Sequence, residues 1–188
     1  ERRDICKQYI RAALGLASEC ISLTRVEKVS YTTAAEFLTD MHILGCGPVT
    51  DICYAAYNGN NIIAVMTFKQ HGANFTLERY AAKDSAIGYC KALFDQFVKD
   101  HSPACIISYM DLRWETDEIY SILGFVQGGT TLPNHWYVKG TKRIHRHKLR
   151  LTEEDSHNNE YETRTRQGYN RIWDCGYSKW EWCKHDFE

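Results

Sequence analysis

The stretch Ser108–Phe125, SYMDLRWETDEIYSILGF, decides the fold that we expect for this chain. It continues a short apolar run at Cys105–Tyr109, which is typical of a buried strand. A charged turn with Asp111 follows, and the stretch then becomes amphipathic, which predicts a helix that ends near Leu123. A strand, a charged turn and a helix in this order predict one unit of a sheet covered by helices.

Length and composition limit the kinds of protein that this chain can be. It has 188 residues, 44% of them hydrophobic and 25% charged, with a net charge of −1, which predicts one globular core with room for a small appendage. No run of roughly 18 apolar residues and no signal peptide is visible, so we expect a cytoplasmic protein without a membrane partner. The chain starts at Glu1 rather than Met, which suggests a piece of a longer protein.

Eight cysteines are present, but none forms a C-x-x-C pair. Several lie inside apolar segments, so we interpret most of them as reduced and buried rather than as a disulfide framework. No spacing of Cys and His predicts a metal site.

Upstream, helical periodicity covers Asp4–Ile21, and Val26–Tyr31 favours a strand. The sequence Thr33-Ala34-Ala35-Glu36 matches a capping box, which predicts a helix that continues to Leu44. The segments Ile52–Tyr57 and Ile62–Phe68 are apolar, and the Asn-Gly between them predicts a hairpin.

The remaining predicted elements alternate. They are a strand at Phe75–Tyr80, a helix capped by Asp84 or Ser85, the strand at Cys105–Tyr109, the helix to Leu123 and a strand at Trp136–Val138. This order predicts an α/β (α+β) fold, with a mixed central sheet flanked by helices. We expect residues 1–27 to form a helix or linker, 28–150 the core, and 151–188 an acidic loop and an aromatic tail that docks on the core.

Several short motifs carry a resemblance to a known family. They are Leu77-Glu78-Arg79-Tyr80, Gly88-Tyr89-Cys90-Lys91, Ser108-Tyr109-x-Asp111, Tyr120 to Phe125, and Arg171-Ile172-Trp173-Asp174-Cys175-Gly176. The chain resembles a GNAT-like bacteriophage family that is related in pattern to the Mom DNA-modification protein and to domains found beside homing-endonuclease-type proteins. The resemblance implies a GNAT-like fold, an acyltransferase, modification of phage DNA against restriction, and a location in the host cytoplasm.

An acyl-CoA donor, acetyl-CoA or another, is the cofactor that this resemblance implies. Its pyrophosphate needs main-chain N–H groups at a helix start. The usual GNAT loop has Arg/Gln-x-x-Gly-x-Gly/Ala, whereas Lys83–Gly88 holds a single glycine. The cofactor-binding candidates are Ala82, Lys83, Ser85, Ala86, Ile87, Gly88 and Tyr89. The alternative is a plain capped helix that packs on the sheet.

Five residues are catalytic candidates: Asp111, Tyr120, His42, Arg79 and Ser108. By the GNAT pattern Tyr120 would protonate the departing thiolate, and otherwise it is an aromatic packed beside Phe125. Asp111 lies just past a strand end, where it would act as a base or hold an amine, unless it caps a helix or pairs with Arg113.

The other three candidates also have structural alternatives. His42 precedes a glycine-rich loop and would serve as a base, a ligand or only a C-cap. Arg79 on an apolar strand needs an anion, either a bound phosphate or carboxylate or a partner within the protein such as Glu78 or Asp111. Ser108 would bind substrate or only the backbone.

The segment Lys139–Arg150 holds six Lys or Arg and no acid. It is a candidate phosphate track on DNA, against the alternative of a solvated surface. The nucleic-acid candidates are Trp136, Lys142, Arg143, Arg146, Lys148 and Arg150. Trp114 or Trp136 would stack on an extruded base, unless both are core residues.

Three hypotheses follow, and DNA is the partner in two of them. The first is a phage GNAT-like transferase that modifies a DNA base. The second is a non-catalytic DNA-binding module of a homing-endonuclease-type protein. The third is an acetyltransferase for a small amine or a protein.

Overall fold

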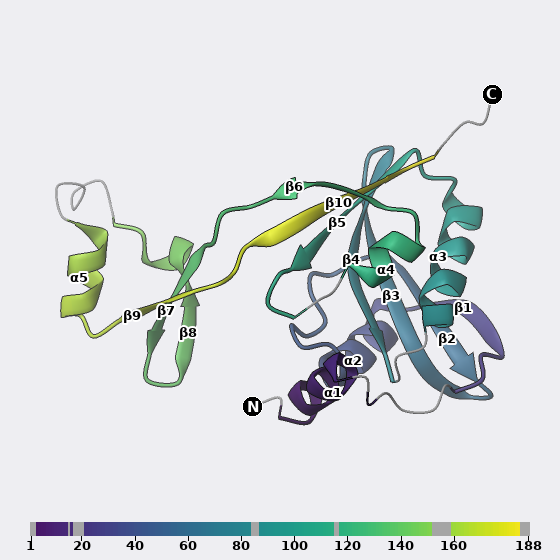
Figure 1. The fold of residues 1–188 in the computed structure, drawn as a ribbon, viewed down its shortest axis with the longest axis horizontal. Helices are drawn as coiled ribbons and strands as arrows, with labels where there is room; N and C mark the ends of the chain where they lie inside the picture. The colour runs from purple at the N-terminus through teal and green to yellow at the C-terminus, as the bar shows by residue number, and fades with distance from the viewer. Residues whose placement is uncertain are drawn as a thin grey trace. The chain divides into compact units, whose positions relative to one another are not determined.

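The computed structural model describes residues 3–14, 16, 21–83, 87–114, 117–151 and 159–184 (Figure 1). In chain order the elements are α1 (Arg3–Ala13), β1 (Arg25–Val29), α2 (Tyr31–Met41), β2 (Ile52–Asn58), β3 (Asn61–His71), β4 (Asn74–Ala82), α3 (Ile87–His101), β5 (Cys105–Asp111), α4 (Glu118–Ile122), β6 (Val126–Thr130), β7 (His135–Lys139), β8 (Lys142–His145), the 3-10 turn η1 (Arg146–Leu149), α5 (Glu160–Arg166), β9 (Asn170–Trp173) and β10 (Tyr177–Cys183). None of the described helices is long and apolar enough to span a membrane.

Two compact units make up the chain. Unit 1 consists of Glu1–Met110, Thr116–Gly129 and Lys179–Glu188, and unit 2 of Asp111–Glu115 and Thr130–Ser178. The structure thus groups residues 130–150 with residues 151–178 of the tail, whereas the predicted bounds placed them in the core. The reason is strand pairing, since β7 pairs with β9 as well as with its hairpin partner β8.

A seven-stranded sheet is the centre of the fold, in the order β1-β2-β3-β4-β5-β10-β6. Strands β1 to β4 are antiparallel, and β5 joins β4 in parallel after the crossover helix α3. The predicted mixed sheet flanked by helices is therefore confirmed. The hairpin between β2 and β3 turns at Gly59 and Asn60, where the φ of Gly59 is +55°.

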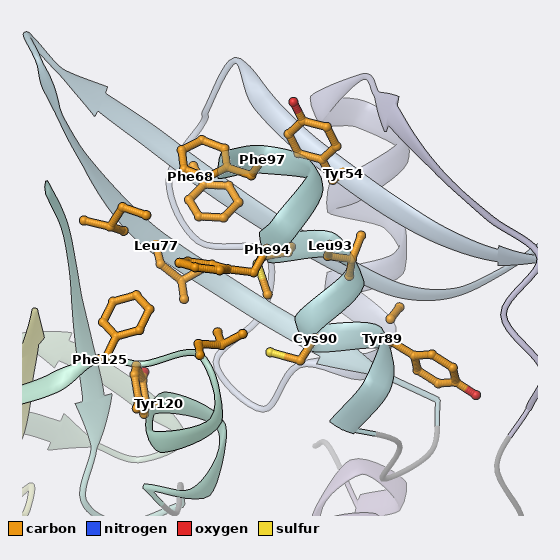
Figure 2. Packing of buried hydrophobic residues seen from close by; sticks show 14 of the residues in the cluster. Tyr54, Phe68, Leu77, Tyr89, Cys90, Leu93, Phe94, Phe97, Tyr120 and Phe125 are labelled. Atoms are coloured by element: carbon orange, nitrogen blue, oxygen red, sulfur yellow. The ribbon is translucent and has the colours of Figure 1, made fainter. Parts of the chain in front are cut away.

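Strand alternation divides the buried side chains between two faces of the sheet. In β2, Tyr54 and Ala56 belong to the cluster that includes the α3 side chains, whereas Cys53 and Ala55 pack with α2. Figure 2 shows the rings of Phe94 and Phe97 of α3 next to Phe68 of the sheet. The centroids of the stacked Phe97 and Phe68 rings are 3.6 Å apart. This aromatic cluster fixes α3 on the sheet.

A bulge in β4 reverses this alternation. Thr67 pairs with Arg79 while Phe68 pairs with Leu77, so Glu78 is the extra residue on β4. Leu77 packs on the α3 side, but Ala81, which follows Arg79 by two, packs with the α2 cluster. The bulge therefore brings Arg79 to the α2 face of the sheet.

Several predicted boundaries need correction. The N-cap of α2 is Ser30, whose Oγ accepts a hydrogen bond from Thr33 N, so the capping box at Thr33 does not start this helix. The strand predicted to reach Tyr31 ends at Val29 for the same reason. The predicted caps Asp84 and Ser85 lie outside the described residues.

Unit 2 holds elements that the sequence did not suggest. Its sheet has the order β8-β7-β9, and Asn159, from the segment predicted to be a loop, caps α5 by accepting from the N–H of Tyr161. Residues 152–158 of that segment lie outside the described residues.

The turn after β9 explains the Trp-Asp-Cys-Gly part of the tail motif. Asp174 is buried, and its Oδ1 accepts hydrogen bonds from Asn134 N at 2.7 Å and Gly176 N at 3.0 Å. Gly176 has a φ of +80°, and a Cβ added there would collide with the Thr131 carbonyl oxygen. Both residues therefore hold the turn that leads from β9 to β10.

Candidate functional site

Two predicted catalytic residues meet in unit 1. The Tyr120 hydroxyl lies 3.2 Å from Ser108 Oγ, and Ser108 Oγ donates to the Leu77 carbonyl oxygen at 3.1 Å. Because the serine proton is used on Leu77, the Tyr120 hydroxyl is the donor in its contact with Ser108. We call these three groups the hydroxyl cluster. It holds a protonated phenol on α4 against β5 and β4.

The hydroxyl cluster lies where the pairing of two strands ends. Strand β4 pairs with β5 only over Asn74–Leu77 and Cys105–Ser108, and Leu77 with Ser108 is the last pair. Beyond it, β4 continues to Ala82 after the bulge at Glu78. We call the end of this pairing the β4–β5 fork. Main-chain groups beyond the fork are not used in β4–β5 pairing, so an extended ligand that contains amides can form strand-like hydrogen bonds there.

Aromatic packing fixes the position of Tyr120. Its ring stacks on Trp180 of β10 at 5.1 Å and makes an edge contact with Phe125 at 5.7 Å. The Nε1 atom of Trp180 is buried and has no hydrogen-bond partner among the described residues. A buried indole N–H of this kind can serve a ligand carbonyl. Tyr120 is therefore packed beside Phe125, as the structural alternative predicted, and its hydroxyl also contacts Ser108.

The start of α3 contains the predicted cofactor residues. Gly88 is exposed with open space around it, and Tyr89 is buried and donates its hydroxyl proton to the Ile21 carbonyl. Lys83 N donates to the Ile63 carbonyl at 2.8 Å, so it continues the sheet. Ser85 and Ala86 lie outside the described residues, as does the Ile87 side chain, and Ala82 is half-buried at the end of β4.

Arg79 lies on the α2 face, against the loop that follows α2. Its Nη1 donates to the Glu78 carbonyl oxygen at 2.6 Å, so the predicted protein partner is a main-chain group rather than a carboxylate. Its Nε is buried without a hydrogen-bond partner among the described residues, and so is Oγ1 of Thr67, its cross-strand neighbour. A Cβ on Gly47 would lie 3.2 Å from Arg79 Nε. Arg79 thus retains a buried donor that a bound anion would satisfy.

His42 has the structural role that was the alternative to a catalytic one. It is the C-cap of α2, and its backbone N–H donates to the Leu38 carbonyl. The side chain is buried, and Nδ1 accepts from Leu44 N at 3.0 Å. The proton on this ring is therefore on Nε2, and the imidazole holds the turn into the glycine-rich loop.

Asp111 belongs to unit 2, where it forms a buried ion pair. Its Oδ1 accepts from the backbone N and Nε of Arg113, at 3.0 Å and 2.9 Å, and its Oδ2 accepts from Nη2. Burial alone would raise the pKa of this carboxyl, but the hydrogen bonds from Arg113 outweigh it and hold the pKa below its usual value. A carboxylate held in this way is a weak base, and the predicted pairing with Arg113 is what the structure shows.

The basic segment, Lys139–Arg150, begins at the last residue of β7 and includes β8 and η1 of unit 2. Lys142, Arg143, Lys148 and Arg150 are exposed, and Arg146 is half-buried. The Arg143 guanidinium covers the Trp136 ring at 4.0 Å, and His145 contacts the same ring edge-on. Trp136 therefore has one face occupied, which limits the stacking that the sequence suggested.

Sequence reasoning missed two residues of this region, Trp180 and Thr67. Trp180 belongs to the aromatic tail, but the pairing that brings β10 to β5 is not visible in local periodicity. Thr67 was one polar position in an apolar run, which is the signal that could have found it. Among the described residues, no group of three His, Cys, Asp or Glu is arranged to hold a metal ion.

Solved structures with the same fold are acetyltransferases. The chain is similar to aminoglycoside 6'-acetyltransferase type Ii, with a TM-score of 0.52 and 13% identity over 85% of this chain and 97% of that one. It is also similar to the ribosomal-protein-S18-alanine N-acetyltransferase from Escherichia coli, with a TM-score of 0.53 and 9% identity over 87% of this chain and 98% of that one.

A third similar structure is a Bacillus subtilis acetyltransferase in complex with CoA, with a TM-score of 0.50 and 15% identity over 87% of this chain and 100% of that one. No family model matches the chain. No curated protein sequence matches it either. At these identities the likeness concerns the fold, and the GNAT-like fold of acetyltransferases is the fold of this chain.

Proposed function

We propose that this chain is an acyltransferase that takes its acyl group from acetyl-CoA or another acyl-CoA, with nucleic acid as the acceptor. The hydroxyl cluster carries the proposal, because it holds a protonated, buried phenol where β4 and β5 stop pairing. The GNAT-like fold supports it, since the Bacillus subtilis acetyltransferase with this fold was solved with CoA.

The residues around the fork fit an acyl-CoA donor. Main-chain groups of Glu78–Ala82 would hold the two amides of its pantetheine arm as a strand does. The first turn of α3, with exposed Gly88, would hold the pyrophosphate through backbone N–H groups that have no partner within the helix. The Nε1 group of Trp180, next to Tyr120, would donate to a carbonyl oxygen.

A bound acyl-CoA would supply a thioester carbon for attack by the acceptor amine. In the transfer a C–N bond forms and the C–S bond breaks. Tyr120 gives its proton to the departing sulfur and regains one from water, while the acceptor nitrogen loses its proton to solvent. Ser108 orients the phenol by accepting from it before transfer, because its own proton is held by the Leu77 carbonyl. Arg79, with its unused buried donor, would hold an anionic group such as a phosphate of the acceptor.

The acceptor class is inferred from unit 2. Its basic segment exposes Lys142, Arg143, Lys148 and Arg150 without an acidic residue between them, which suits a phosphate backbone. Together with the resemblance to the Mom-related phage family, this surface favours a base in phage DNA as acceptor, in the host cytoplasm, with protection from restriction as the benefit.

Two alternatives make different predictions. A non-catalytic DNA-binding module would bind DNA in a salt-dependent way and release no CoA. An acetyltransferase for a small amine or a protein would bind CoA and have no affinity for DNA. The buried hydroxyl cluster favours catalysis over the first, and the basic segment favours nucleic acid over the second.

The test is to incubate the chain with acetyl-CoA and DNA, then to measure free CoA and the masses of the digested nucleosides. We expect CoA release that depends on DNA, and a nucleoside heavier by one acyl group. CoA release with amines or peptides but not with DNA would contradict nucleic acid as the acceptor. If no acceptor led to CoA release from any of a panel of acyl-CoA donors, the acyltransferase activity itself would be contradicted.

A further inference from the structure

Unit 2 contains a hollow of 330 Å³ between α5 and β9. It is lined by Tyr161, Thr165, Tyr169, Asn170, Arg171 and Trp173, and we call it the aromatic pocket. Helical spacing places Tyr161 and Thr165 on one face of α5, and strand alternation places Tyr169, Arg171 and Trp173 on one face of the β9 strand and its approach. Its volume is at the lower end of the range for small-ligand sites.

The walls of the aromatic pocket expose rings that a core would bury. The side chain of Trp173 is 59% exposed and that of Tyr161 is 49% exposed. The Arg171 guanidinium lies 4.7 Å from the centroid of the Tyr161 ring, and its Nη2 donates to the Tyr137 hydroxyl at 3.2 Å. Glu160 accepts the Tyr137 proton at 2.7 Å and lies 3.9 Å from Arg171. Arg171 is therefore held in position by the buried Tyr137 and the half-buried Glu160.

Positive charge surrounds this side of the sheet. Lys139 pairs with Lys142 across β7 and β8, and Tyr137 pairs with Arg171 across β7 and β9, so these alternate residues share one face. Lys139 Nζ lies 5.1 Å from the centroid of the Tyr169 ring, at the wall of the aromatic pocket. Exposed rings next to Lys and Arg are the combination that binds single-stranded nucleic acid.

A buried polar group lies behind the exposed ring. His135 is 7% exposed, and its ring centroid is 5.0 Å from that of Trp173. Its Nε2 has no hydrogen-bond partner among the described residues, and neither does Nε of Arg146. A buried polar atom without a partner, such as His135 Nε2 next to the exposed indole of Trp173, suits a ligand with a polar edge better than a purely apolar one.

We propose that the aromatic pocket binds an unstacked nucleobase of single-stranded nucleic acid, while the basic segment holds the adjoining phosphates. A base offers a flat π surface to Trp173 and Tyr161, and polar edge atoms to Arg171 and Asn170. The proposal rests on the nucleic-acid acceptor proposed above. It assigns the base contact to Trp173 rather than to Trp136, whose ring is covered by Arg143.

The test is fluorescence anisotropy with a labelled single strand and with an abasic strand that has the same number of phosphates. Trp173→Ala should weaken binding of the normal strand by roughly fivefold or more and leave binding of the abasic strand unchanged. Trp173→Phe keeps a ring and should recover most of the affinity. Ile172→Ala is the matched control, because Ile172 is 49% exposed on the opposite face of β9.

Any other outcome contradicts the proposal that the aromatic pocket binds a nucleobase. Equal affinity of Trp173→Ala and the unchanged chain for the normal strand overturns it, and so does an equal loss on the abasic strand, which would reveal a purely structural effect. If the chain binds both strands equally well, the aromatic pocket is wrong while the nucleic-acid acceptor stands. If the chain binds neither strand, the base-binding pocket and the nucleic-acid acceptor are both wrong. The acyltransferase activity is then still tested by CoA release with other acceptors.

Discussion

The two units use tyrosine in opposite ways. In unit 1 the Tyr120 ring is 7% exposed and stacked on Trp180, and its hydroxyl reaches Ser108. In unit 2 the Tyr161 ring is 49% exposed and faces the Arg171 guanidinium. A buried phenol with a fixed hydroxyl suits proton transfer, whereas an exposed ring beside a cation suits the binding of a flat, electron-rich ligand. Under the function proposed above, unit 1 would carry out the chemistry and unit 2 would recognise the acceptor.

Polar groups show the same difference. The hydroxyl cluster consists of neutral hydroxyls and a carbonyl, with each proton assigned to an acceptor. Unit 2 instead exposes permanent cations, such as Lys142 and Arg143, whose effect extends over a Debye length. The first arrangement depends on position within about 0.5 Å, and the second depends mainly on charge. Substitutions should therefore affect different measurements in the two units.

Removing the phenol hydroxyl should have the largest effect. Tyr120→Phe keeps the ring stacked on Trp180 but removes the proton donor, so kcat for acyl transfer should fall by about 10²–10⁴. Binding of DNA should not change, and steady-state kinetics beside anisotropy measures both. Tyr54→Phe is the matched control, because Tyr54 is buried in the same core cluster and its hydroxyl bonds only Asp100 among the described contacts. A kcat for Tyr120→Phe equal to that of the control would refute the assignment of Tyr120.

The turn after β9 should be the next most sensitive place. Gly176→Ala adds a Cβ against the Thr131 carbonyl at a φ of +80°, so it should lower the free energy of unfolding of unit 2 by about 3 kcal/mol. Gly140→Ala is its control, since Gly140 has a φ of +58° with open space around it, and it should cost only about 1 kcal/mol. Hydrogen exchange of β7 and β9 amides measures both, and equal protection in the two variants would contradict the close contact.

Removal of charge from unit 2 should have a smaller and specific effect. Lys142→Gln combined with Lys148→Gln should reduce the slope of log Kd against log salt by about 1.4 on single strands, if both contact phosphates. Lys69→Gln with Lys91→Gln removes the same charge from exposed positions of unit 1 and should leave the slope unchanged. Equal slopes for the two double variants would show that the basic segment is not the phosphate track.

The smallest effect concerns His135. Burial and the positive charges of Arg171 and Arg146 hold the pKa of this imidazole below its ordinary value of about 6.5. The unfolded chain therefore binds a proton at a higher pH than the folded one, so unit 2 should lose stability as pH falls below about 6.5 until the folded pKa is reached. NMR titration should give a pKa under 6.5 that rises in Arg171→Gln. An unchanged pKa in that variant would contradict the proximity of the two charges.

The sequence was enough to predict a mixed central sheet and its strands β1 to β5. These strands depend on local patterns: apolar runs and the Asn-Gly hairpin at Gly59. The contact between Tyr120 and Ser108 was not predicted, although both residues were catalytic candidates. In unit 2, local patterns predicted a strand at Trp136–Val138 but not the sheet to which it belongs. Its β7–β9 pairing joins residues about 35 positions apart, for example Tyr137 with Arg171, and such pairing leaves no periodic signal.

Individual side chains were harder to predict than elements. The sequence shows Asp111 and Arg113 two residues apart, but the bidentate pairing depends on the turn that brings the guanidinium back to the carboxylate. The tail motif suggested function, yet Asp174 and Gly176 hold a turn. Trp173, the last residue of β9, is the aromatic residue of that motif, and its exposure suggests binding. Exposure is decided by tertiary packing, which composition does not contain.

Under the function proposed above, unit 1 would hold an acyl-CoA where β4 and β5 stop pairing, next to the hydroxyl cluster. Titration of the ¹⁵N-labelled chain with CoA, followed by backbone amide NMR, tests it most directly. We expect the largest shifts at Glu78–Ala82, at Tyr109 and in the first described turn of α3, and no shift at Phe97 towards the other end of α3. Absence of shifts at saturating CoA, or shifts confined to unit 2, would contradict it.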